Sequence, residues 1–393
     1  MITRRELDQL RGEWSLAVDV LEKDYALGWT LAGIAQHPDL ASMWVFKGGT
    51  CLRKCFYETY RFSEDLDFTV VANGPEEPAE LQSIFAEVAD WVYDESGIEL
   101  VVDDSTFRHG ENRRGKRTTQ GRLAYRGPNA SRRTPPKVKL DLTSDEAVVL
   151  EPVTRRIVHH YSDGPLPVRG VLAYPITELF AEKLRALSER CRPRDLYDVI
   201  YLHRHPDLYG KATEVEEVLR EKCAFVGIAV PTLESLLTTP YRVEIEGEWE
   251  SMLGHQLPKP LPPFLSHWNA LGDVFDWLAG LRQTVELPRA EQEGLDPEGL
   301  SPVAIRTWER GFPLQLLQYS AANRLCVEVN YHAKDGKVGP KIVEPYSLRR
   351  TREGNYLLFV VNDQGLLRSF RVDRIAGMRP TTQTFDPKYR VEL

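Results

Sequence analysis

Residues 44–71 read W-V-F-K-G-G-T-C-L-R-K-C-F-Y-E-T-Y-R-F-S-E-D-L-D-F-T-V-V, and this stretch decides the fold. In its second half, apolar residues at positions 66, 68 and 70 alternate with polar ones, which predicts a strand with one buried face. Asp65 and Asp67 share the other face and lie about 6–7 Å apart along the strand. Carboxylates this close repel each other, and a divalent cation such as Mg²⁺ or Mn²⁺ relieves that repulsion. The strand therefore predicts a metal site.

The first half of the same stretch carries a glycine turn. Gly48-Gly49 follows an apolar run, and such a turn lets backbone N–H groups face phosphate oxygens. Thr50 adds a hydroxyl donor, and the apolar residues after it recur at helical spacing. Either motif alone fits an ordinary turn or an acidic strand edge. Together, and in this order, they are typical of the way polymerase-type nucleotidyltransferases hold a triphosphate and its metal ions.

A third carboxylate and a lysine extend this pattern. Residues 137–143 alternate again, so Asp141 is predicted on a neighbouring strand, where it would complete a metal site and accept a proton. Residues 176–190 predict an amphipathic helix with Lys183 in the middle of its apolar stripe. A lysine there is rarely buried without a partner, so Lys183 either forms a structural salt bridge or contacts the triphosphate.

The next predicted helix opens with Arg194-Asp195-Leu196-Tyr197-Asp198 after Pro193. Asp198 follows Asp195 by three residues and Arg194 by four, so these side chains can share one face of the helix. Ordinary helix capping explains Asp195 nearly as well as catalysis does. The choice between Asp195 and Asp198 as the catalytic acid stays open at this point.

Positive charge is concentrated between positions 108 and 137, where ten basic residues stand against one acid in a chain of net charge −8. A solvated loop is the ordinary explanation of such a run. Because this segment lies between the two predicted acidic strands, we favour a surface that attracts a polyanion, RNA rather than DNA. The residues expected to contact RNA are Arg113, Arg114, Lys116, Arg117, Arg122, Arg126, Arg132 and Arg133.

The chain of 393 residues is long enough for two or three domains. Residues 1–285 are predicted to form an α+β catalytic domain with a helical extension, followed by a Pro-, Gly- and Glu-rich linker at 286–303. Short alternating runs between turn residues predict a small β-barrel at 304–393. The five cysteines form no C-x-x-C pair, which favours a cytoplasmic protein without disulfides or a zinc site. No apolar run approaches the length of a membrane span.

Four blocks of motifs, in the same order, resemble the AbiEii/AbiGii nucleotidyltransferase toxin family, including the MenA-type toxins. They are F-K-G-G-T with R-x-S-x-D-L-D-F, then K-x-D, then E-x-x-x-x-K and finally R-D-L-Y-D. The resemblance covers roughly residues 40–285 and implies a DNA polymerase β-like fold. It also implies transfer of a nucleoside monophosphate from an NTP to RNA, in characterised members to the 3′ end of tRNA, which blocks translation. Members are usually paired with an antitoxin encoded beside them and are implicated in phage defence.

This resemblance assigns roles to particular residues. Metal binding falls to Asp65, Asp67 and Asp141, and catalysis to these three together with Lys183, Asp195 and Asp198. Thr50 stands where many members have serine. The expected nucleotide-binding residues are Lys47, Gly48, Gly49, Thr50, Lys183 and Arg194.

The tail, about residues 304–393, resembles a WYL domain, an Sm/SH3-like barrel that binds nucleic acid or nucleotide ligands. The matching segments are R-L-C-V-E-V-N-Y, G-N-Y-L-L and R-S-F-R-V-D-R-I, with Asn355 in place of the tryptophan of the name motif. The residues expected to contact its ligand are Arg349, Tyr356, Arg368, Arg371 and Arg374.

The sequence therefore predicts a toxin-class nucleotidyltransferase that depends on Mg²⁺ or Mn²⁺ and modifies RNA. One alternative is a small-molecule nucleotidyltransferase of the antibiotic-modifying kind, and the basic segment argues against it because a small acceptor needs no such surface. The other is a nucleic-acid-binding regulator built on the WYL tail with a degenerate catalytic domain. The intact Asp65, Asp67, Asp141 and Lys183 argue against that alternative.

Overall fold

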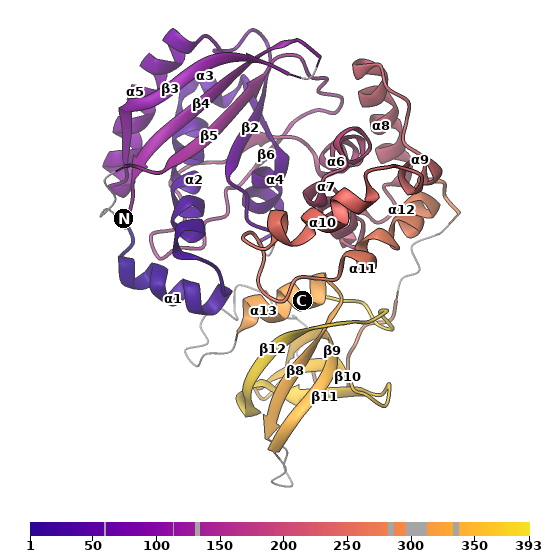
Figure 1. Ribbon diagram of the computed structural model, residues 1–393. Coiled ribbons are helices and arrows are strands. Elements are labelled where there is room, and N and C mark those ends of the chain that lie inside the picture. The colour runs from indigo at the N-terminus through magenta and orange to yellow at the C-terminus, as the bar shows by residue number, and fades with distance from the viewer. Residues whose placement is uncertain (59, 113, 130–133, 282–286, 296–312, 333–337) are drawn as a thin grey trace.

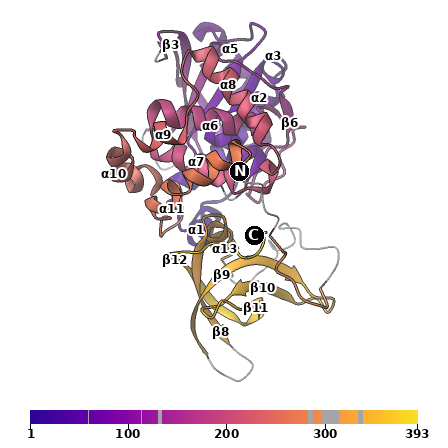
Figure 2. The same ribbon diagram turned by 90° about the vertical axis from the view of Figure 1, so that its right-hand side faces the viewer.

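The structure is a computed structural model, and it describes residues 1–58, 60–112, 114–129, 134–281, 287–295, 313–332 and 338–393. Two sheets organise the chain, one in its first half and one in its tail (Figures 1 and 2). Helices cover the first sheet and also form a separate group beside it. This mixture of helices with two sheets agrees with the predicted α+β class. No helix among the described residues is long and apolar enough to cross a membrane.

The first sheet has seven strands in the order β3-β4-β5-β2-β1-β7-β6. Their bounds are β1 (Trp44–Lys47), β2 (Asp65–Val70), β3 (Glu99–Glu111), β4 (Arg117–Arg126), β5 (Lys137–Thr143), β6 (Val153–Arg155) and β7 (Val171–Ala173). β2 pairs with β1 in antiparallel and with β5 in parallel, so the two predicted acidic strands lie side by side at the centre. The described part of the basic segment forms β4 and the adjoining ends of β3 and β5 rather than one long loop.

The helices of the first domain fall into three groups. One group packs on the sheet, a short pair follows the glycine turn, and the rest gather beside the sheet in Figure 1. The helices on the sheet are α2 (Val18–Gln36) and α5 (Pro78–Ser96), and α1 (Arg4–Trp14) and α3 (Pro38–Ala41) pack against α2. After the turn come α4 (Gly48–Cys51) and the π-helical η1 (Leu52–Phe56). The group beside the sheet consists of α6 (Ile176–Arg190), α7 (Pro193–His203), η2 (Pro206–Leu208), α8 (Ala212–Val226), α9 (Leu233–Leu237), α10 (Arg242–Leu253), α11 (Phe264–Trp268) and α12 (Leu271–Leu278).

Aromatic packing sets which face of the central strands is polar. Trp44 and Phe68 are buried with their ring centroids 5.2 Å apart, and the Trp44 ring lies 6.3 Å from Phe85 of α5. Successive strand residues point to opposite faces, so burial of these rings turns Asp65 and Asp67 away from the helices that cover the sheet. The packing of these rings therefore sets the acidic residues on the opposite face of the strands.

The tail begins with a helix where the sequence pattern predicted only strands. Its elements are α13 (Leu314–Ala322), β8 (Leu325–His332), β9 (Val338–Arg350), β10 (Tyr356–Val361), β11 (Leu367–Arg371), η4 (Val372–Arg374) and β12 (Ile375–Thr384). The five strands are antiparallel in the order β11-β10-β9-β8-β12. This sheet is open, so the predicted closed Sm/SH3-like barrel is not confirmed.

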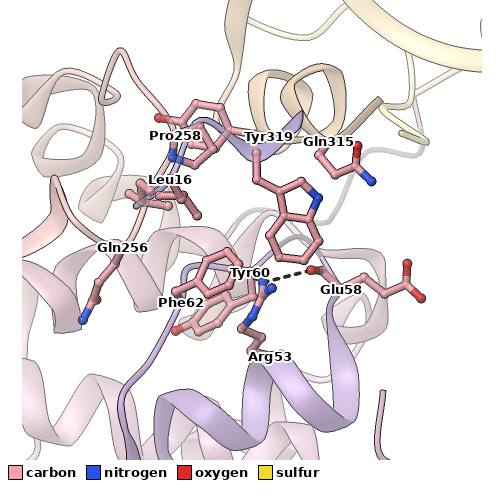
Figure 3. Close-up of a pocket in the computed structure, with 11 residues that line it drawn as sticks. Leu16, Arg53, Glu58, Tyr60, Phe62, Gln256, Pro258, Gln315 and Tyr319 are labelled. Carbon is pink, nitrogen blue, oxygen red and sulfur yellow. Dashed lines mark hydrogen bonds between the residues drawn. The ribbon is translucent and has the colours of Figure 1, made fainter. Parts of the chain in front are cut away.

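The tail packs against the first domain through α13. The Tyr319 hydroxyl donates a hydrogen bond to the Pro260 carbonyl oxygen at 2.8 Å. The Tyr319 ring is also part of the large buried cluster that forms the core of the first domain. Figure 3 shows a small hollow at this junction, where Gln315 and Tyr319 of α13 approach Leu16 and Phe62. The two domains thus share buried surface.

The predicted linker lies partly outside the described residues, at 286 and 296–303. Its described part runs along the tail, where Ala290 is fully buried and Leu295 forms a β-bridge with Thr351. The backbone N–H of Arg390 donates to the Pro288 carbonyl oxygen at 2.9 Å. Residues 287–295 are thus packed on the tail rather than free in solvent.

Candidate active site

A tight glycine turn joins β1 to α4 beside the acidic strand. Gly48 has a φ of +79°, in the left-handed region that glycine adopts without strain. A Cβ atom on Gly48 would lie 2.2 Å from Asp67 Oδ2, and one on Gly49 would lie 2.8 Å from Arg61 Nη2. Only glycine therefore allows the turn to approach β2 this closely. The structure brings the predicted turn directly against Asp67.

Three carboxylates share one face of the central strands. Asp67 lies opposite Asp141 across the parallel β2–β5 pair, and Asp65 lies opposite Lys139 in the same pair. Lys47 lies opposite Asp67 on the other side, in β1. Residues opposite each other in a sheet point to the same face. The register therefore gathers the three predicted metal-binding acids and Lys47 around one place.

Negative charge in this group is poorly balanced. Burial and the neighbouring carboxylates of Asp141 and Asp65 raise the pKa of Asp67 to about 7. Burial and Asp65 also raise the pKa of Asp141. Lys139 Nζ lies 3.5 Å from Asp65 Oδ1, a buried atom without a hydrogen-bond partner among the described residues. Raised pKa values are what carboxylates give when they are grouped together with too little positive charge around them.

The donor chemistry suits a hard divalent cation, because Mg²⁺ and Mn²⁺ prefer carboxylate oxygens. In their present positions, the side chains that the structure describes form no group of three His, Cys, Asp or Glu residues that could hold a metal ion. Binding would therefore require the carboxylates of Asp65, Asp67 and Asp141 to draw closer together. The attraction of a doubly charged ion favours that movement.

Thr50 does not present its hydroxyl to the site. Its side chain is 1% exposed, and Oγ1 donates a hydrogen bond to the backbone oxygen of Asp65 at 2.5 Å. The hydroxyl therefore fastens the acidic strand to α4. The expectation that this hydroxyl donates to a nucleotide is corrected, because its hydrogen is already used inside the fold.

Lys47 belongs to a buried ion network that the sequence analysis missed. Its Nζ lies 3.3 Å from Glu146 and 3.8 Å from Glu182, and Lys222 Nζ lies 2.9 Å from the fully buried Glu178. Burial lowers the pKa of Lys47, but the attraction of Glu182 and Glu146 outweighs it and raises that pKa overall. Lys222 stands among buried apolar residues of α8. The pattern that singled out the lysine of α6 could therefore have identified it.

Lys183 lies where α6 and α7 approach the acidic strands. Its Nζ is 2.8 Å from Asp198 Oδ2, and Arg61 donates to both oxygens of Asp198 at 2.6 and 2.7 Å. Burial would raise the pKa of Asp198, but Arg61 and Lys183 outweigh it and hold that pKa well below the usual range. Lys183 thus forms the salt bridge that was one of its two expected roles. Its charge also lowers the pKa of Asp67 in part, so it acts on the carboxylates too.

Asp195 and Arg194 occupy the first turn of α7. Asp195 is fully buried and accepts two hydrogen bonds from Arg190, at 2.6 and 2.7 Å. Arg194 Nη2 lies 3.5 Å from His255 Nε2, and Arg194 Nε is buried without a partner among the described residues. Asp195 and Asp198 are both neutralised by neighbouring cations. Their contacts hold the helices in place, in contrast to the acids of β2 and β5.

A basic surface begins beside the carboxylates on the same face of the sheet. In β4, Gln120 lies opposite Asp141 and Arg122 lies opposite Lys139. Arg122, Lys139 and Lys116 are exposed. An extended polyanion on this face would therefore pass directly beside the carboxylates.

The other predicted RNA contacts are mostly paired with acids of the same domain. Arg114 lies 2.7 Å from Asp145, Arg117 lies 2.7 Å from Glu77, and Arg126 lies 2.5 Å from Glu99. Tyr125, the aromatic residue within this segment, is 1% exposed and is part of the core. Arg113, Arg132 and Arg133 lie outside the described residues.

The structure does not place the five expected ligand contacts of the tail on one face. Arg349 pairs with Glu392, and Arg371 pairs with Asp373 at 2.6 Å. Arg349 and Arg371 both lie opposite Leu357 of β10, whereas Arg368 lies opposite Val360. Alternation along the strand then directs Arg368 to the other face from Arg371. Tyr356 begins β10, and Arg374 ends η4.

Comparison with known proteins agrees with both resemblances. The family described as "Nucleotidyl transferase AbiEii toxin, Type IV TA system" matches residues 29–279, which include the whole carboxylate site. The family described as "WYL domain" matches residues 314–380. Among solved structures, "Proteasome accessory factor B/C (PafBC) of Arthrobacter aurescens" is similar at 11% identity over 92% of this chain and 71% of that chain, with a TM-score of 0.17, too low to support an argument. No curated protein sequence matches.

Proposed function

Because this chain belongs to the AbiEii nucleotidyl transferase toxin family, we propose that it transfers a nucleoside monophosphate from an NTP to the 3′ end of an RNA, most simply a tRNA, and thereby blocks translation. The observation that carries this proposal is the register that sets Asp67 opposite Asp141 beside the Gly48 turn. A glycine turn for phosphates next to grouped carboxylates is the minimum that metal-assisted nucleotidyl transfer requires.

Each part of the site has a proposed task. The N–H groups of the Gly48-Gly49 turn and the Lys183 ammonium group face the triphosphate, while Asp65, Asp67 and Asp141 would hold Mg²⁺ or Mn²⁺. The ion would neutralise charge that develops on the phosphates. Asp141 lies on the strand nearest the basic surface. Its carboxylate would accept the proton of the attacking 3′-hydroxyl, whose oxygen bonds to the α-phosphorus of the NTP as pyrophosphate leaves.

The basic surface supports RNA as the acceptor. Arg122 and Lys139 are exposed on the face that carries the carboxylates, and their positive charge attracts a phosphodiester backbone. A small acceptor would not need this surface, so the surface does not support the small-molecule alternative. We also propose a cognate antitoxin, in accordance with the type IV toxin–antitoxin description of the family, action in the cytoplasm and a role in phage defence.

The decisive experiment incubates the purified chain with each α-labelled NTP and total RNA, in Mg²⁺, in Mn²⁺ and in EDTA. We expect label on an RNA band of tRNA size in the presence of metal and none in EDTA. The Asp67→Asn variant should lose the labelling, whereas Asp94→Asn, a matched change on the exposed face of α5, should keep it.

Other outcomes would overturn the proposal. Label that appears only on small molecules would favour the antibiotic-modifying alternative. RNA binding without transfer of label from any NTP would favour the regulator alternative.

A further inference from the structure

A cavity of about 340 Å³ lies between the first domain and the tail, away from the carboxylates. Its walls come from η1 and the end of α7 on one side, and from α13 and the last residues of the chain on the other. Figure 1 shows α13 and the C-terminal end of the chain between the two sheets. The volume is within the range of pockets that take small molecules. Nothing in the proposed transfer reaction uses this cavity.

Two arginines from different domains face this cavity. Arg204 directly follows α7, and Arg324 lies in the turn between α13 and β8, with a φ of 56°. Neither guanidinium group forms an ion pair with a carboxylate among the described residues. Burial and the charge of Arg324 lower the pKa of Arg204, and burial also lowers the pKa of Arg324. The fold therefore holds two poorly compensated cations together at the domain boundary, which costs stability unless an anion joins them.

The charge of Asp386 in the tail raises the pKa of Arg204 only in part, and the other nearby acid on the tail side is already engaged. Glu392 lines the cavity, but its two carboxylate oxygens contact Arg349 and Arg289. The rest of the wall includes Glu58 and Gln318 as well as aromatic rings. The Tyr57 and His205 rings lie with their centroids 4.0 Å apart. Two guanidinium groups beside aromatic rings suit a phosphate group attached to a small organic molecule, since arginine binds phosphate through paired hydrogen bonds.

We propose that this cavity binds a small phosphate-bearing molecule, with its phosphate between Arg204 and Arg324. The site lies apart from the five arginine and tyrosine positions that the sequence assigned to a tail ligand. Because each domain supplies one arginine, the ligand joins the tail to the first domain. The inference does not rest on the proposed nucleotidyl transfer.

Isothermal titration calorimetry of the full chain tests this site. The titration is done in EDTA and phosphate-free buffer at low salt, with inorganic pyrophosphate in one arm and AMP in the other. We expect binding in at least one arm, and tighter binding of AMP would show that the ring also contacts the aromatic wall. Arg204→Gln and Arg324→Gln should each weaken binding about tenfold or more, because each removes a charged hydrogen-bond donor from the phosphate.

The matched control is Arg220→Gln, an exposed arginine of α8 outside the cavity that pairs with Glu216, and this variant should bind as the wild type does. The thermal stability of the unliganded Arg204→Gln protein should equal or exceed that of the wild type, since one of two repelling charges is gone. Three results would overturn the proposal: no binding in either arm, unchanged affinity in both cavity variants, or loss of affinity in Arg220→Gln instead.

Discussion

Asp24 and Asp67 lie in the same domain, but the charge around them is opposite. Asp24 is 1% exposed, and its two oxygens lie 2.8 Å from Arg53 Nε and 2.7 Å from Lys54 Nζ. Burial would raise the pKa of Asp24, but Lys54 and Arg53 outweigh it and hold that pKa well below the usual range. Burial raises the pKa of Asp67, and the negative charges of Asp141 and Asp65 raise it further, to about 7.

This difference shows what distinguishes a functional acid from a structural one here. Burial does not separate the two, since both aspartates are removed from water to some extent. The neighbouring charges do distinguish them. A buried acid that is paired with cations holds the fold together, whereas grouped acids lower stability and favour the binding of a cation. Asp198, between Arg61 and Lys183, resembles Asp24 in this respect.

The largest expected change in the free energy of unfolding is at Asp24, the aspartate with two cationic partners. Asp24→Asn removes the charge that neutralises Arg53 and Lys54, which are both buried, and should lower the free energy of unfolding by about 3–5 kcal/mol. Urea denaturation at pH 8 measures it, with Asp94→Asn as the exposed control. A loss no greater than that of the control would contradict the structural role of Asp24, because it would show that its ion pairs with Arg53 and Lys54 do not stabilise the fold.

Lys183→Met removes one of the two cations that pair with Asp198 and leaves the other, Arg61, in place. Asp198 keeps both hydrogen bonds from Arg61, so the loss should be smaller, about 1.5–3 kcal/mol. Lys211→Met at the N-cap of α8, where Lys211 forms an exposed ion pair with Glu214, is the matched control and should change stability by less than about 0.5 kcal/mol. A Lys183→Met protein more stable than the wild type would mean that the apolar stripe prefers methionine there and that the salt bridge is not stabilising.

Asp67→Asn should stabilise the protein, in contrast to the two substitutions above. The pKa of Asp67 rises from an ordinary 3.8 to about 7 on folding. At a pH between these two values, the folded state therefore binds one more proton than the unfolded state. The wild type should therefore lose stability as pH rises from about 4 through about 7, and asparagine removes that loss. In EDTA at pH 8 the variant should be more stable by about 1–3 kcal/mol, and the difference should vanish near pH 4. A difference that is independent of pH would contradict the assigned repulsion.

The smallest effect on stability is expected at the basic surface. Lys116→Gln with Arg122→Gln should change the free energy of unfolding by less than about 0.5 kcal/mol, because both side chains are exposed. The same pair should reduce the salt dependence of RNA binding, lowering the slope of log K against log salt by about 1–2. Arg117→Gln is the control, since its pairing with Glu76 and Glu77 already offsets its charge. An unchanged slope in the double variant would remove this surface from the RNA site.

Local pattern predicted the elements that carry the site. Alternation around Asp65 and Asp67 gave β2, and the apolar stripe around Lys183 gave α6 with the bounds that the structure has. The periodicity of side chains along one element is a property of the sequence, so it could be read without the fold. α13 was not predicted in the tail, although Leu314, Leu317 and Ala321 recur at helical spacing.

The amino-acid sequence alone specifies which residues carry charge, where the glycine turn falls, and that two acidic strands exist. Which of these charges come into contact depends on the fold. The parallel register places Asp67 opposite Asp141, and α7 brings Asp198 to Arg61 across 137 residues of chain. It also commits the Thr50 hydroxyl to a backbone oxygen and sets Arg204 near Arg324. The physical reason is that electrostatic interaction depends on distance and burial, and contacts between distant segments leave no period in the sequence.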